Sequence, residues 1–231
     1  MAGGVAAEQG SWREEILEVN APPERVPRMY TRLAPVYELW ARATESRARR
    51  RVIEVAGLTG EEDVLEVATG TGAQLVRLAG SNRGRTVGVE LADGMLARTR
   101  KRLDAAGLTD RVELIQANAL ELPLEDESFD LLVNSYMLDL LTRDDIPRAL
   151  AEFKRVLRPR GRLVLSNMAK AERRRHGFWD AAYGRGLQLT ANCRGVLAAP
   201  VLAELGFVAI QREYLAQMLF PTEIVTARKE E

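Results

Sequence analysis

The sequence contains very little cysteine or histidine, with one residue of each among 231. Cys193 has no second cysteine with which to form a disulfide, and together with His176 it cannot supply an ordinary zinc site. We therefore expect no metal centre and a reducing compartment. The chain also lacks an apolar run of about 18 residues and a basic-then-apolar start, so we expect a cytoplasmic protein, with peripheral contact at a membrane surface left open.

Net charge is missing as well, because 33 lysines and arginines balance 33 aspartates and glutamates. A chain without net positive charge is not attracted as a whole to a polyanion, so we expect no DNA partner. Only four of the 33 basic residues are lysines, which leaves 29 arginines. Arginine clusters at 42–51 and 173–175 suit an anionic headgroup or a membrane surface, and solvated helix faces are the alternative explanation.

Composition and local patterns suggest one globular domain with a short leading segment. Hydrophobic residues make up 46% of the chain and charged residues 29%, which is ordinary for a folded soluble domain. Residues 1–28 are polar and contain three prolines, which predicts an N-terminal arm. Residues 29–231 are expected to form a single domain, with a helical cap over 29–60 and a core over 61–231.

From residue 63 onward, short apolar runs alternate with helical segments, a pattern typical of a parallel α/β sheet. The runs predict strands at 63–68, 86–90, 112–116, 129–134 and 161–167. Helices are predicted near 72–80, 92–107, 144–157 and 195–205, with an irregular basic and aromatic segment after residue 167. The runs 207–215 and 223–228 are separated by a turn containing Pro221, and they predict an antiparallel hairpin at the sheet edge.

The strongest local motif is VLEVATGTGA at 64–73, in which an apolar strand runs into a Gly-x-Gly turn that opens a helix. Glycine lets a ligand approach the backbone closely, and the free N–H groups of a helix start favour polar or anionic groups. Glu90 ends the next strand about 20 residues later, where a carboxylate can accept hydrogen bonds from both hydroxyls of a ribose. Together these features predict a nucleoside cofactor.

The residues around the turn also indicate the charge of that cofactor. A dinucleotide fingerprint has glycine at the positions occupied here by Ala68 and Leu75, so a pyrophosphate is disfavoured. Glu66 would repel a diphosphate, but it would suit the ammonium and sulfonium groups of S-adenosylmethionine. The turn therefore favours a cationic cofactor.

Over about residues 29–228 the sequence resembles the class I S-adenosylmethionine-dependent methyltransferases. VLEVATGTG is similar to their first motif, VGVEL to their second, QANALELPLEDESFD to their third, and LAEFKRVLRPRGRLVLSNM to the helix and strand that follow. The resemblance implies a Rossmann-like α/β fold, with a mostly parallel seven-stranded sheet, an antiparallel last strand and helices on both faces. YTRLAPVYELW resembles the segment before the core in ubiquinone and menaquinone biosynthesis methyltransferases and bacterial phospholipid N-methyltransferases, which implies a small-molecule or lipid-like acceptor.

The resemblance also implies roles for individual residues. The methionine part of S-adenosylmethionine would contact Glu66, Ala68, Thr69, Gly70, Thr71 and Gly72. Glu90 would hold the ribose; the adenine would lie between Leu91 and Met95, with its edge at Asn118 and Ala119. Asn134 is also expected to contact the cofactor. Tyr30 and Tyr37 are seven residues apart, on one face of a predicted helix. They would form a lid over the cofactor, and the alternative is that they pack against the core. The chain departs from the family at Ala68, usually glycine, and at Asn118, usually aspartate.

Methyl transfer is an in-line displacement with release of S-adenosylhomocysteine, and it mainly requires alignment of the acceptor and exclusion of water. The acceptor pocket is expected around 134–139, after the fourth strand. There Asp139 could act as a base or hold a cation, and Tyr136 could hydrogen-bond the acceptor or offer a π face. The alternatives are a helix cap for Asp139 and a packing role for Tyr136. His176 could act as a base near neutral pH, and a solvated surface histidine is its alternative.

These observations predict an S-adenosylmethionine-dependent methyltransferase acting on a small or lipid-like acceptor. An RNA or protein methyltransferase is one alternative, and it would need a basic groove with exposed aromatic residues. A non-catalytic cofactor-binding subunit is the other, and the intact Gly70, Gly72 and Glu90 argue against it. The oligomeric state stays open.

Overall fold

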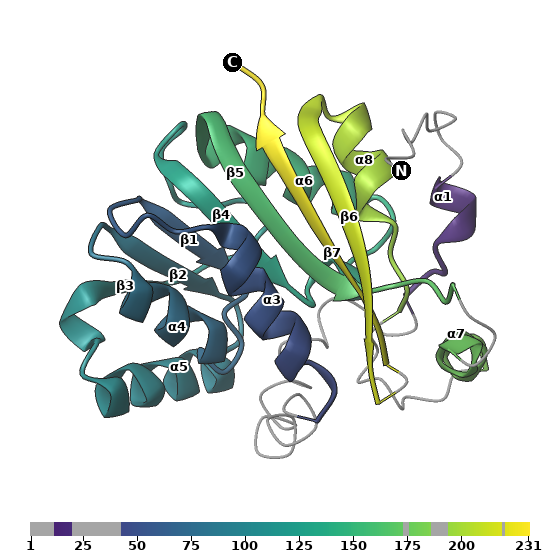
Figure 1. Ribbon diagram of the computed structural model, residues 1–231, viewed down its shortest axis with the longest axis horizontal. Helices are drawn as coiled ribbons and strands as arrows, with labels where there is room; N and C mark the ends of the chain where they lie inside the picture. The colour runs from purple at the N-terminus through teal and green to yellow at the C-terminus, as the bar shows by residue number, and fades with distance from the viewer. Residues whose placement is uncertain (1–11, 20–42, 173–175, 186–193, 219) are drawn as a thin grey trace.

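A seven-stranded sheet forms the centre of the protein, in the order β3-β2-β1-β4-β5-β7-β6 (Figure 1). The computed structural model describes residues 12–19, 43–172, 176–185, 194–218 and 220–231. The strands are β1 Val64–Val67, β2 Thr86–Glu90, β3 Val112–Gln116, β4 Phe129–Ser135, β5 Leu157–Met168, β6 Phe207–Gln217 and β7 Phe220–Lys229. Only β7 pairs antiparallel with its neighbours, and the other pairs are parallel. The predicted fold class is confirmed.

Helices cover both faces of the sheet (Figure 1). α3 Ser46–Ala56, α4 Ala73–Ser81 and α5 Asp93–Ala106 lie on one side, and α6 Asp145–Val156 and α8 Ala198–Glu204 lie on the other. The shorter elements are α1 Trp12–Glu15, η2 Thr109–Arg111, η3 Leu138–Leu140 and α7 Gly177–Gly184. Among the residues that the structure describes, no helix is long and apolar enough to cross a membrane.

The central strands are apolar throughout because both of their faces are covered. Val64 of β1 packs with Val52 of α3, and the next residue, Leu65, belongs to the core on the opposite side with Phe153 and Leu202. Successive side chains of a strand point to opposite faces, so a strand buried on both sides has no polar alternation. This burial explains the uninterrupted apolar runs from which the strands were predicted.

The predicted and observed elements differ mainly near Pro159. β5 begins at Leu157, four residues before the predicted start at 161. Its pairing with β4 shifts register between Phe129 and Leu131, and Arg160 has a φ of +64°. The Pro159-Arg160-Gly161 sequence therefore forms a bulge within the strand, where the sequence alone suggests a turn. A second difference is α7, which lies in the segment predicted to be irregular.

The described part of the N-terminal segment packs onto the domain. Trp12 and Ile16, one helical turn apart, are 1% and 0% exposed and belong to the core beside α6 and α8. Arg143 donates to the carbonyl of Ile16 at 2.7 Å, and Arg13 pairs with Asp144 at 2.8 Å. Residues 12–18 are thus part of the folded structure rather than a polar arm extending from it, because their two large apolar side chains share one face.

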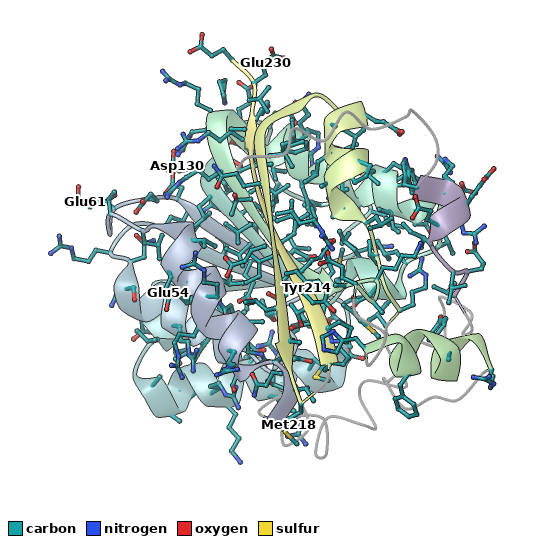
Figure 2. All side chains as sticks on the ribbon, turned by 45° about the vertical axis from the view of Figure 1, so that its right-hand side comes forward. Glu54, Glu61, Asp130, Tyr214, Met218 and Glu230 are labelled. Carbon is teal, nitrogen blue, oxygen red and sulfur yellow. The ribbon has the colours of Figure 1, made fainter. Side chains whose placement is uncertain are left out.

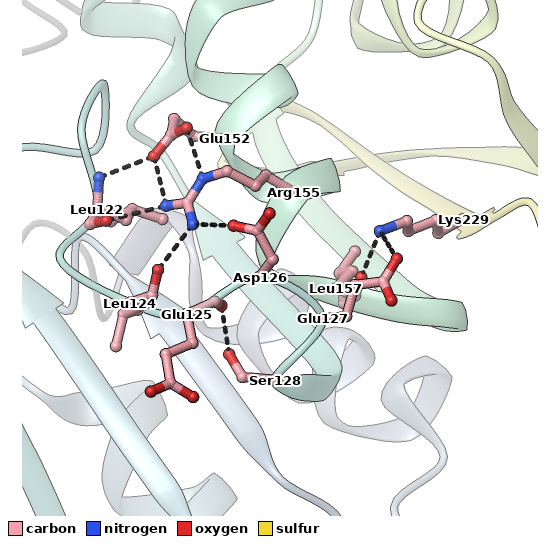
Figure 3. Close-up of polar contacts among 10 residues, drawn as sticks. All are labelled: Leu122, Leu124, Glu125, Asp126, Glu127, Ser128, Glu152, Arg155, Leu157 and Lys229. Carbon is pink, nitrogen blue, oxygen red and sulfur yellow. Dashed lines mark hydrogen bonds and ion pairs between the residues drawn. The ribbon is translucent and has the colours of Figure 1, made fainter.

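The segment between β3 and β4 is held in place by Arg155 of α6 (Figure 3). The guanidinium donates to the carbonyls of Leu122 at 2.9 Å and Leu124 at 2.7 Å. It also pairs with Asp126 at 2.7 Å and with Glu152 at 2.9 Å. These bonds fix a segment whose first residues form one wall of the cavity described next.

Candidate cofactor and acceptor site

A cavity of about 380 Å³ lies at the carboxyl-terminal edge of the sheet, where β1, β2, β3 and β4 end. Its described lining comprises residues 67, 68, 70, 89–92, 95, 117–120, 135–137, 140–142 and 145. The strand order reverses between β1 and β4, and ligands of open α/β sheets bind at such a point. The volume falls within the range of small-molecule sites, about 300–1,000 Å³.

The turn after β1 has an unusual backbone. Ala68, Gly70 and Gly72 have φ values of +59°, +57° and +75°. At Gly72 a Cβ atom would also lie 2.9 Å from Cγ2 of Thr99, so only glycine fits there. Ala68 adopts this left-handed conformation despite its Cβ atom, at a cost of roughly 1 kcal/mol. Ala68 is the position at which the sequence departs from the glycine of the family motif.

Glu90 anchors this turn to the end of β2. One carboxylate oxygen accepts the N–H of Gly70 at 2.8 Å, and the other accepts the N–H of Ala92 at 2.9 Å. Burial raises the pKa of Glu90, and the bonds from the backbone N–H groups partly offset that rise. Each oxygen keeps a further lone pair, so a carboxylate at the cavity wall can still accept a ligand hydroxyl.

The charge of the cavity lining is one-sided. Glu90 and Asp145 contribute carboxyl groups, and no lysine or arginine belongs to the described lining, although Arg148 behind it pairs with Asp145 at 2.7 Å. Such a site attracts a cation and repels a diphosphate. Leu91, Met95 and Ala119 add an apolar surface suited to a flat base. The residues present therefore fit a nucleoside with a positively charged tail, as in S-adenosylmethionine.

Half of the fourteen predicted cofactor residues line the cavity: Ala68, Gly70, Glu90, Leu91, Met95, Asn118 and Ala119. Thr69, Thr71 and Gly72 belong to the turn but not to the described lining. The hydroxyl of Thr69 is 3.4 Å from that of Thr99 on α5, and the hydroxyl of Thr71 accepts from Arg102 at 3.4 Å. Tyr30 and Tyr37 lie outside the described residues.

Glu66 and Asn134 are buried beside the cavity rather than on its described wall. Asn134 is 0% exposed and donates to the carbonyl of Val67 at 2.8 Å, so it ties β4 to β1. Oε2 of Glu66 has no hydrogen-bond partner among the residues that the structure describes. Burial raises the pKa of Glu66 well above its usual value, although Arg49 acts in the opposite direction. The fold thus disfavours the charged form of Glu66.

Among the three candidate catalytic residues, only Tyr136 reaches the cavity wall. Its hydroxyl lies 2.9 Å from that of Thr222 on β7, and its ring packs near Phe220. Burial raises the pKa of Tyr136 well above its usual value, so the phenol stays protonated. Because its hydroxyl contacts Thr222 on β7, Tyr136 forms part of the cavity wall by packing. This agrees with the packing role that was the alternative for Tyr136.

Asp139 and His176 lie away from the described cavity wall. Asp139 is 0% exposed, and its Oδ2 accepts the N–H of Met168 at 3.2 Å, whereas Oδ1 has no hydrogen-bond partner in the described part of the chain. Burial raises the pKa of Asp139 to about 7. His176 is 1% exposed, with Nδ1 2.5 Å from the hydroxyl of Tyr214, so the expectation of a solvated surface histidine is wrong. The aromatic partner comes from β6, which is distant in sequence.

Arg194 is a residue near the site that sequence reasoning missed. It is 0% exposed, and its guanidinium donates to the carbonyls of Asp139 at 2.8 Å, Leu141 at 2.6 Å and Leu17. Leu141 lines the cavity, so Arg194 connects the N-terminal segment to the cavity wall. Burial lowers the pKa of Arg194. Nothing in the local sequence distinguishes it from the other arginines, because its partners are backbone carbonyls of distant segments.

Comparison with known proteins identifies the class. Residues 64–161 match the methyltransferase domain family. The crystal structure of the cyclase SpnF has the same fold, with a TM-score of 0.74 at 22% identity over 93% of this chain and 99% of that one. The match shows that the chain contains a methyltransferase domain, and the relatives below are similar to it among the class I S-adenosylmethionine-dependent methyltransferases.

Within that class the chain is similar to quinone-biosynthesis enzymes. It is 38% identical over 125 residues to the ubiquinone/menaquinone biosynthesis C-methyltransferase UbiE of Proteus mirabilis, covering 53% of this chain and 49% of that protein. It is 35% identical over 142 residues to the demethylmenaquinone methyltransferase of Thermus thermophilus, covering 59% and 63%. The chain thus spans about half the length of the first curated relatives that it matches.

Proposed function

We propose that the protein transfers a methyl group from S-adenosylmethionine to a lipid-like acceptor with a quinol-type ring. The observation that carries the proposal is a cavity at the strand ends whose described lining is apolar with two carboxylates and no basic side chain. This lining suits a cationic cofactor next to an apolar acceptor. The names of the relatives, a quinone-biosynthesis C-methyltransferase and a demethylmenaquinone methyltransferase, support the acceptor class.

Bound S-adenosylmethionine would supply a methyl carbon made electrophilic by the adjacent sulfonium, and S-adenosylhomocysteine would leave. The residues of the chain bind and orient. Glu90 would accept the ribose hydroxyls while keeping Gly70 and the turn in place. Leu91 and Met95 would flank the adenine, and the Asn118 amide would meet its edge.

The acceptor side of the cavity is formed by the segment after β4. Met137, Leu140 and Leu141 give it an apolar surface that excludes water and aligns a flat ring. Asp139, buried behind this segment, accepts the N–H of Met168 and thereby fixes the segment to β5. We therefore assign Asp139 and Arg194 to positioning the acceptor wall. The acceptor loses a proton when it gains the methyl group, and this proton would pass to solvent, with no residue of the chain assigned as the base.

Cofactor binding is tested by titrating S-adenosylmethionine into the full chain in a calorimeter. We expect Glu90→Ala to weaken binding by about 1–3 kcal/mol, because it removes charge-assisted bonds to the ribose. Since Glu90 also holds Gly70, a second variant, Ala119→Trp, fills the cavity without disturbing that bond. The control is Glu113→Gln, an exposed carboxylate on β3. Unchanged affinity in both cavity variants would contradict the cofactor assignment.

The acceptor is tested with S-adenosylmethionine labelled in its methyl group and a panel of demethylated quinols, phospholipids, small amines and RNA. We expect label in the quinols only. A fold of this kind also occurs in a cyclase, so the fold alone does not select the reaction. Cofactor binding without transfer to any acceptor would support a non-catalytic subunit, and label in RNA would support a macromolecular substrate.

A further inference from the structure

The arginine-rich start of α3 lies against the tip of the β6–β7 hairpin. The side chain of Gln217 accepts the backbone N–H of Arg47 at 2.8 Å and donates to the carbonyl of Ala43 at 2.6 Å. Between α3 and β6 lies a hollow of about 230 Å³, lined by Arg47, Arg50, Arg51, Glu54, Leu215 and Ala216. We call Arg47, Arg50, Leu215, Ala216 and Met218 together the basic edge.

The basic edge contains two arginines, Arg47 and Arg50, beside a paired one. Arg51 pairs with two carboxylates, Glu213 at 2.8 Å and Glu54 at 2.9 Å, so these three arginines and two glutamates together carry a net charge of +1. Arg47 and Arg50 are exposed, and neither guanidinium forms an ion pair within the described part of the chain. Two free guanidinium groups beside a hollow are suited to hold the oxygens of a phosphate group.

An exposed apolar residue lies next to these arginines. Met218, in the turn between β6 and β7, is 73% exposed, and Figure 2 shows it at the end of the molecule opposite Glu230. Because β7 runs antiparallel, the strand starts at the edge where β1 and β4 end. The basic edge therefore lies at the same edge of the sheet as the cavity.

We propose that the basic edge binds an anionic lipid bilayer, with a phosphate headgroup in the hollow and Met218 in the interfacial layer. The inference rests on the proposed function, because a lipid-soluble acceptor has to pass from a bilayer to the cavity. Exposed apolar side chains combined with basic ones are typical of surfaces that lie on anionic membranes. A polynucleotide is less suited, since the apolar members of the edge include no aromatic ring on which a base could stack.

The proposal is tested by sedimenting the full chain with vesicles. We use phosphatidylcholine alone and phosphatidylcholine mixed with phosphatidylglycerol. We expect binding to the mixed vesicles only, weakening as salt is raised. Replacing Arg47 and Arg50 by glutamine should lower the partition coefficient by about fivefold for each arginine. Met218→Ser should lower the partition coefficient by about fourfold. This is the effect expected when roughly one methylene group less is buried in the interfacial layer of the bilayer.

The matched control replaces two exposed arginines at the opposite edge of the sheet. Arg83 and Arg160, with side chains 80% and 74% exposed, are changed to glutamine together, which removes the same charge from another place. The proposal predicts that this control binds mixed vesicles nearly as well as the wild type. An equal loss in both double variants would overturn the proposal, and so would equal binding of the wild type to both kinds of vesicle.

Two further probes separate other occupants of the hollow. Inorganic phosphate is titrated into the chain on its own. If it binds at the hollow while the chain binds no vesicles, the proposal of a lipid surface is wrong and the ligand is a free phosphate compound. Binding of an RNA oligonucleotide, lost in the Arg47 and Arg50 variant and without vesicle binding, would overturn it in favour of a polynucleotide. S-Adenosylmethionine affinity is expected to stay unchanged in every variant, since none of these residues lines the cavity, so failure here is distinct from failure of the proposed function.

Discussion

Asp139 is a buried carboxyl group whose neighbours compensate only part of its charge. The N–H of Met168 satisfies one oxygen, and no described residue forms a hydrogen bond with the other. Arg194 lowers the pKa of Asp139 through its charge, but its N–H groups bond to backbone carbonyls instead. The folded state thus favours the protonated acid, with a pKa of about 7 against an ordinary value of 3.8.

Asp139→Asn should therefore stabilise the protein in a pH-dependent manner. Below pH 3.8 the carboxyl is protonated in both states, and as pH rises toward 7 the unfolded state loses its proton first, so wild-type stability falls. The asparagine variant should gain little near pH 4 and up to about 4 kcal/mol near pH 8. Urea denaturation across this range measures the difference. Asp110→Asn, on the exposed η2, is the control, and a pH-independent gain would contradict the argument.

Two residues of the cavity wall have backbones that L-residues rarely adopt. Ala68 has a φ of +59° and Tyr136 one of +52°, and they follow β1 and β4, the two strands at the switch point. Such conformations cost about 1–3 kcal/mol each and are concentrated at functional sites. Their presence on facing loops agrees with a site whose shape is imposed by the surrounding structure.

At the scale of elements, the segment between β3 and β4 depends on a side chain of α6. Arg155→Lys keeps the charge, but it loses the planar fork that serves Leu122, Leu124 and Glu152 together (Figure 3). We expect a loss of about 1–3 kcal/mol in unfolding free energy, together with weaker cofactor binding because residues 117–120 line the cavity.

The control for this prediction lies on the same helix. Arg148 is 65% exposed and pairs only with Asp145 among the described residues, so Arg148→Lys should change the unfolding free energy by less than about 0.5 kcal/mol. Denaturant unfolding and calorimetric titration compare the two variants. Equal losses in both would show that the Arg155 network does not support the segment.

At the scale of the whole molecule, we expect residues 12–18 and the core to unfold as one unit, because Trp12 and Ile16 belong to the core. Trp12→Ala removes a ring that is 1% exposed and belongs to the core beside α6, so we expect a loss of about 3–5 kcal/mol in a single transition. Leu17→Ala, at a side chain 41% exposed, should cost much less. A separate early transition in thermal unfolding, or no loss of stability, would restore the view of a detached arm.

The chain has no net charge, but acidic and basic side chains occupy different parts of one edge of the sheet. The described cavity lining has carboxyl groups and no basic side chain, whereas Arg47 and Arg50, beside the hairpin tip, form no ion pair with any described residue. A cationic cofactor and an anionic surface can therefore be attracted by different parts of the same edge. The cluster at 173–175 and Arg42 lie outside the described residues.

The sequence by itself determined the fold class, the presence and order of the strands along the chain, and the turn with Glu90, because these depend on local periodicity and on short-range spacing. The strands at 86–90 and 112–116 were predicted with their observed bounds. Only the tertiary structure decided which side chains meet: Arg194 with the carbonyl of Leu141, His176 with Tyr214, Trp12 with the core. Such contacts join segments far apart in the chain, and burial, which sets the pKa of Asp139, exists only once they have packed together.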